Sequence, residues 1–74
     1  MEVLHSYQTD REGNDCLIIE AIALIRVTSG FYIVIHATQV MGSWTGDPVE
    51  TKHWNFYSYN EAKTYFNELY EQIK

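Results

Sequence analysis

The stretch LIIEAIALIRVTSGFYIVIHATQV, from Leu17 to Val40, decides the fold of this chain. It is mostly aliphatic or aromatic, and only Glu20 and Arg26 carry formal charges. Thr28-Ser29-Gly30 divides it into two segments rich in β-branched residues, which favour strands. We predict two strands, over residues 16–28 and 31–40, joined as a hairpin. A helix over residues 16–28 is the alternative, since Asp15 could cap it and the segment is apolar on every side.

The segments on either side of this hairpin extend it to four strands. Residues 3–9 predict a first strand that turns through the polar run DREGND. The alternating run KHWNFYSY predicts a last strand, with Trp54 and Phe56 pointing to the same side. Between the predicted third and last strands, VMGSWTGDPVE contains the only proline and two of the four glycines, and we expect a loop of about ten residues there.

The C-terminal run YSYNEAKTYFNELYEQIK predicts an amphipathic helix. Apolar residues recur in it at spacings of four, three and four, which is one stripe of a helix: Ala62, Phe66, Leu69 and Ile73. Ser58 and Glu61 match the S-x-x-E capping box, and Asn60 is a rival N-cap. The predicted fold class is α+β: a four-stranded antiparallel β-meander with one C-terminal α-helix packed on one face, in a single domain of residues 1–74.

Charge and composition exclude several classes of function. Ten acidic residues against five scattered basic ones give a net charge of -5. Binding to nucleic acid needs clustered cations, and an anionic surface also repels phospholipid, so other proteins are the expected large partners. The start of the chain lacks the pattern of a signal peptide, and charges interrupt every apolar run before it could span a membrane. Together with the single cysteine, Cys16, this predicts a cytoplasmic protein.

The sequence predicts neither catalysis nor a cofactor. Three histidines and Cys16 are of ligand type, but no two of them have the short spacing typical of metal sites, so no metal is predicted. DREGND resembles the opening of a calcium loop, but the sixth position is Asp15 instead of glycine and the twelfth is Ala21 instead of glutamate. No nucleophile elbow, phosphate loop or paired-carboxylate motif is present, and we expect no enzyme activity.

Period-two alternation divides the predicted sheet into two apolar faces, although one helix can cover only one of them. We expect the helix to pack on the following residues: Ile19, Ala21, Ala23, Ile25, Ile33, Ile35, Ala37, Trp54 and Phe56. The uncovered face is then predicted to hold Ile18, Ile22, Leu24, Tyr32, Val34, Val40 and Tyr57. Large contiguous apolar surfaces that are exposed usually mark interaction sites, and we expect this face to mediate a homodimer. If residues 16–28 were a helix, it could cover the face itself.

The expected function is a small non-enzymatic protein-binding module that acts as an inhibitor or as a regulatory or accessory protein, a class that includes proteins of phages and mobile elements. Acidic mimicry of nucleic acid is one form that this could take. The predicted partner-binding residues are the uncovered face, without Ile18, and Trp44, because a tryptophan between glycines can anchor a loop in a partner's pocket. The alternative is a small-ligand or metal-binding protein, with a site between protomers formed by His36, His53, Tyr57 and Trp44.

Overall fold

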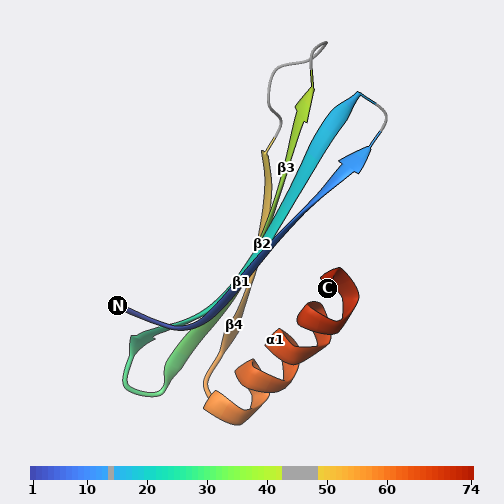
Figure 1. Ribbon diagram of the computed structural model, residues 1–74. Helices are drawn as coiled ribbons and strands as arrows, with labels where there is room; N and C mark the ends of the chain where they lie inside the picture. Colours follow the sequence, from blue (N-terminus) through green and yellow to red (C-terminus); the bar gives the residue numbers. More distant parts are fainter. Residues whose placement is uncertain (14, 43–48) are drawn as a thin grey trace.

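A computed structural model describes residues 1–13, 15–42 and 49–74, and it has the predicted architecture. Its elements in chain order are β1 (Glu2–Gly13), β2 (Cys16–Thr28), β3 (Phe31–Gly42), β4 (Val49–Phe56) and α1 (Tyr59–Ile73). The strands form one antiparallel sheet in the order β1-β2-β3-β4, with α1 along one side (Figure 1). This confirms the α+β meander, and the alternative of a helix over residues 16–28 is wrong.

β1 is longer than the strand predicted over residues 3–9. β1 continues through most of the DREGND run, where Gly13 pairs with Cys16 of β2. The turn between β2 and β3 contains Gly30, whose φ of 82° lies in the left-handed region that glycine adopts without a steric penalty. β2 and β3 therefore pair closely from the turn to Gly42, with one irregularity between Arg26 and Thr28.

The helix covers only part of the length of the sheet. α1 has 15 residues, about 22 Å at 1.5 Å per residue. β2 has 13 residues, about 43 Å at 3.3 Å per residue. In Figure 1 the strands continue well past the C-terminal end of α1, toward the hairpin that joins β1 and β2. The sheet therefore has a half that α1 covers and a half that it does not.

The hydrophobic core lies between α1 and the two central strands. Its buried members are Ile22, Leu24, Val34, Ala62, Phe66 and Leu69. Tyr32 from β3 and Trp54 and Phe56 from β4 pack against this cluster. The helical stripe and the two β4 aromatics are where the sequence predicted them. The face of β2 and β3 that meets the helix, however, is the opposite of the one we predicted.

The pairing register between β3 and β4 explains this correction. Val34 lies opposite Trp54, and Tyr32 lies opposite Phe56, so these pairs project from the same side of the sheet. We had placed Ile33 and Ile35 beside the β4 aromatics, which is a register error of one residue. Because side chains alternate with a period of two, that slip moves every side chain of β2 and β3 to the other face.

α1 begins at the predicted position, but the predicted side-chain hydrogen bonds of its N-cap differ from those observed. Ser58 is the N-cap residue and its carbonyl accepts a hydrogen bond from the Ala62 amide, at 3.1 Å. Within the described residues its hydroxyl makes no capping hydrogen bond, so the predicted capping box is not formed. Thr64 Oγ1 instead donates to the Asn60 carbonyl, at 2.8 Å. No helix in the described parts of the chain is long and apolar enough to cross a membrane.

Candidate functional site

The side of the sheet that faces away from α1 presents an apolar surface, which we call the open face. It consists of half-buried residues of β2 and β3 that alternate with the core positions: Ile19, Ala21, Ala23, Ile25, Ile33, Ile35 and Ala37. On the edge strands the same side of the sheet is mostly polar, with Ser6 and Gln8 on β1 and Thr51 and His53 on β4. An apolar centre with a polar border is the composition of many protein interfaces.

The open face is hollow at its centre. Ala21 lies opposite Ala37, and Ala23 lies opposite Ile35. A depression of about 280 Å³ is lined by these residues together with Ser6 and Gln8 of β1. Ile19 lies beyond one end of the alanines and Ile25 beyond the other, so the surface offers both projections and a recess.

The alanines lie at the centre of the open face, at positions that alternate along β2 and β3 with larger side chains on the helix side. Ile22, Leu24 and Val34 are at most 2 % exposed beneath α1. A helix that packs on this sheet buries more apolar volume over these residues than over the alanines, and hydrophobic stabilisation grows with the area buried. The size difference between the two faces was present in the sequence, and it was the signal that could have identified the open face.

The predicted partner-binding residues are therefore distributed differently from the expectation. Ile22, Leu24 and Val34 are buried, and Tyr32 packs against the core, so placing these four on an uncovered face was wrong. Val40 is half-buried on the helix side of the sheet, by its alternation with Val34. Tyr57 is 79 % exposed and stacks on Phe31, with ring centroids 5.4 Å apart. Trp44 lies outside the described residues.

A charged cluster lies on the helix side of the sheet, next to the core. Glu20 of β2 is only 8 % exposed. Its carboxylate pairs with Arg11 of β1 and lies 3.1 Å from Nε2 of His36 on β3, which is opposite the core residue Ile22. The cluster joins three adjacent strands, so it can hold them together beside the core.

These contacts determine the ionisation of Glu20. Burial by itself would raise the pKa of this carboxyl group, but hydrogen bonds and charge interactions with Arg11 and His36 outweigh it. The net effect lowers the pKa of Glu20 below its ordinary value. Glu20 therefore stays ionised in the fold, and its charge is matched by the neighbouring cation. We interpret the cluster as structural.

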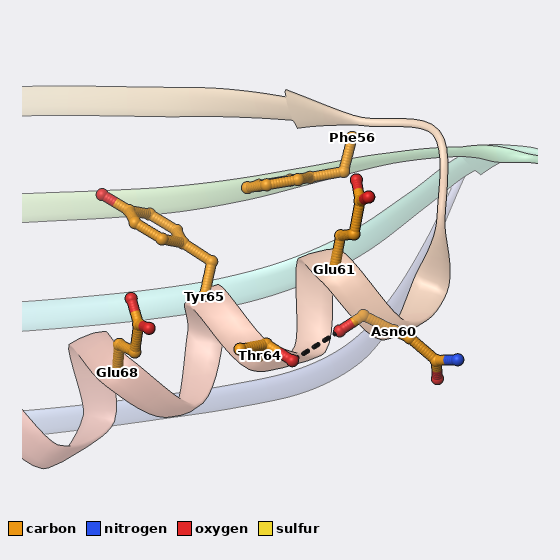
Figure 2. Close-up of a pocket in the computed structure, with 6 residues that line it drawn as sticks. All are labelled: Phe56, Asn60, Glu61, Thr64, Tyr65 and Glu68. Carbon is orange, nitrogen blue, oxygen red and sulfur yellow. Dashed lines mark hydrogen bonds between the residues drawn. The ribbon is translucent and has the colours of Figure 1, made fainter.

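A groove lies between α1 and the C-terminal end of β4 (Figure 2). It has a volume of about 420 Å³, within the range of ligand-binding pockets. Its lining combines aromatic rings and helix side chains: Phe56, Asn60, Glu61, Thr64, Tyr65 and Glu68. Tyr65 is fixed by two aromatic neighbours, with ring centroids 4.7 Å from Trp54 and 5.7 Å from Phe56.

The histidines proposed for a ligand site do not lie on one face. His36 lies opposite Ile22 and Lys52, which places it on the helix side, whereas His53 lies opposite Ile35 and belongs to the other side. The alternative site, which needed both histidines together, therefore does not form on one face of the sheet. Among the described residues, no group of three or more His, Cys, Asp or Glu side chains is arranged to hold a metal ion.

Comparison with known proteins does not assign the chain to a family. No family model matches it, and neither a curated protein nor a solved structure matches it at a significant level. Functional inference must therefore start from the surfaces described above.

Proposed function

We propose that this protein is a homodimeric, non-enzymatic protein-binding module that acts as an inhibitor or as a regulatory or accessory protein. The observation that carries the proposal is the open face, an apolar surface on two central strands with no element of the described chain packed over it. A sheet whose second face meets water usually carries polar residues there, and apolar ones indicate a partner.

The dimensions of the molecule suit a second copy as the cover. Its two longer extents are 43 and 22 Å, an outline of about 950 Å² for the whole molecule. A stable interface buries about 800 Å² per partner, so the contact would extend from the open face over the edge strands. Two such faces stacked about 10 Å apart form a β-sandwich. In that arrangement isoleucines of one copy fill the alanine recess of the other, and both helices remain on the outside.

The charge of the chain does not oppose this assembly. The seven open-face residues are uncharged. The nearest acidic side chains on the same side, Asp10 opposite Ile19 and Glu12 opposite Leu17, lie on edge strand β1. Repulsion between two copies of net charge -5 is therefore kept to the border of the interface, where water and salt screen it.

A matched pair of lysine substitutions on β3 tests the dimer. Ala37 is on the open face, whereas its neighbour Thr38 lies opposite Glu20 on the other side of the sheet. Light scattering coupled to size-exclusion chromatography should give a dimer mass for the wild type and for Thr38→Lys over about 1 µM to 1 mM. Ala37→Lys should give a monomer mass, with an unchanged circular dichroism spectrum. A wild type that is monomeric throughout this range refutes the proposal.

The alternative, a ligand or metal site between protomers, receives less support from the geometry. It relied on His36 and His53 acting together, and they project from opposite sides of the sheet. Native mass spectrometry with and without a chelator separates the two hypotheses. A bound metal or ligand mass that disappears with the chelator would favour the alternative, and a bare dimer mass favours the module.

A further inference from the structure

We propose that the groove between α1 and β4 binds an extended, arginine-containing segment of a partner protein. This names the partner chemistry for the protein-binding function and rests on that function. It does not depend on the dimer, because the groove lies on the helix side of the sheet and the open face lies on the other.

The floor of the groove is an aromatic surface. Tyr65 is half-buried, and its ring lies 4.7 Å from that of Trp54 in an edge-on arrangement and 5.7 Å from that of Phe56. Figure 2 shows the Tyr65 and Phe56 rings side by side along the groove. Aromatic surfaces of this kind accept apolar side chains and the planar guanidinium group of arginine, which stacks on a ring through cation–π attraction.

Two glutamates lie on either side of Tyr65. Glu61 is four residues before it and Glu68 three residues after it, so the three side chains lie on one face of α1. Both carboxylates line the groove and are exposed. An arginine that stacks on Tyr65 can therefore reach a carboxylate on either side of the ring.

These two glutamates are not neutralised within the described chain. Four of the five basic side chains pair with other carboxylates: Arg11 with Glu20, Arg26 with Glu2, Lys52 with Glu50 and Lys74 with Glu71. The fifth, Lys63, lies 5.3 Å from the Phe66 ring centroid. Both carboxylates are therefore available to a second molecule, and a cationic segment is the electrostatic complement of this groove.

The spacing of the glutamates indicates the form of the segment. Glu68 is seven positions after Glu61, which corresponds to about 10 Å along α1. A polyproline II segment repeats every three residues and rises about 3.1 Å per residue, so arginines three positions apart lie on one side, about 9 Å from each other. The sequence Arg-Pro-Pro-Arg matches this distance and also offers prolines to the aromatic floor.

The test uses short synthetic peptides and the full-length protein. The peptide acetyl-Ala-Arg-Pro-Pro-Arg-Ala-amide is titrated into isotopically labelled protein, and amide chemical shifts are followed by NMR. We expect the shifts to centre on Phe56, Tyr65 and the neighbouring residues of α1. Two control peptides, one with both arginines replaced by glutamate and one with the arginines only two positions apart, should bind more weakly.

Two double variants separate the groove from general charge attraction. Glu61→Gln with Glu68→Gln should weaken binding of the peptide roughly five- to twenty-fold, as expected for two exposed ion pairs. Asp10→Asn with Glu12→Gln makes the same change in net charge on the other side of the sheet, and should leave binding unchanged. Equal weakening by both variants, equal binding of the control peptides, or no binding at millimolar peptide overturns the proposal.

The monomer variant makes the two proposals independently testable. Ala37→Lys should bind the peptide as the wild type does, because its substitution lies on the open face. Peptide binding by a monomeric wild type would refute the dimer and leave the groove intact. A dimer that does not bind the peptide would refute the groove and leave the dimer intact.

Discussion

Two neighbouring residues of β2 provide the sharpest test of which face the helix covers. Leu24 is fully buried beneath α1, with 0 % exposure, and Ile25 is half-buried on the open face. Replacing either residue by alanine removes the same number of carbon atoms from the same central strand. The two substitutions therefore differ mainly in the environment that each side chain leaves.

The expected losses of stability differ severalfold. Leu24→Ala leaves a cavity against the α1 residues Phe66 and Leu69, and such substitutions cost about 2–5 kcal/mol. Ile25→Ala removes a side chain that is partly in water in the monomer, and we expect a loss of about 1 kcal/mol. For a chain of 74 residues, the whole free energy of unfolding is roughly 4–11 kcal/mol. Leu24→Ala should therefore remove a large share of it.

Urea unfolding followed by far-UV circular dichroism measures both losses. With a denaturant slope of about 1 kcal/mol/M, the Leu24→Ala midpoint should fall by roughly 2–5 M, enough to leave some of the protein unfolded without urea. At low protein concentration the Ile25→Ala midpoint should fall by about 1 M.

Protein concentration separates folding from assembly in this experiment. Leu24→Ala should lose the same amount of stability relative to wild type in dilute and concentrated samples. The loss for Ile25→Ala should increase with concentration, because only the wild-type open face is stabilised by a partner. Equal losses in dilute samples, or a larger loss for Ile25→Ala there, would refute the assignment of the faces.

Two further predictions concern the charged cluster and the β2–β3 turn. Because the pKa of Glu20 is lowered in the fold, its contribution is present above the unfolded-state carboxyl pKa and is lost as the pH falls through the folded-state value. Glu20→Gln should therefore cost about 1.5–3 kcal/mol at pH 7 and reduce the slope of stability against pH below about pH 5, whereas an unchanged acid limb would contradict this role. Gly30→Ala should cost about 1 kcal/mol of unfolding free energy, measured in urea, because a φ of 82° is unfavourable for a residue with a Cβ. An added Cβ meets no atom within 4 Å, so no steric clash adds to this cost, and an unchanged stability would contradict the prediction.

The secondary structure was predictable because it depends on local patterns. β-branched residues around the Ser29-Gly30 turn favour a hairpin, and the stripe from Ala62 to Ile73 has a helical period. These preferences act between residues close in sequence, so the order of strands and the C-terminal helix followed from them. The capping box was predicted from the residue types at positions 58 and 61 alone. It did not form: among the described residues the Ser58 side chain makes no capping hydrogen bond.

The candidate sites were predictable only in part. Excess apolar residues on β2 and β3 correctly implied that one helix would leave a face uncovered. The groove was not predicted, because it depends on where α1 lies relative to β4. One clue was the placement of Glu61 and Glu68 on the same helical face as Tyr65, a residue that the apolar stripe did not include.

By itself, then, the sequence determined the elements, their order and the presence of surplus apolar surface. Tertiary structure decided which apolar set is buried. A period-two pattern is the same for either face, and the choice depends on the pairing of Val34 with Trp54, a contact between β3 and β4 that no local pattern determines. Once that register is set, Ile22, Leu24 and Val34 meet the helix, and the alanine-centred face is left uncovered by the described chain.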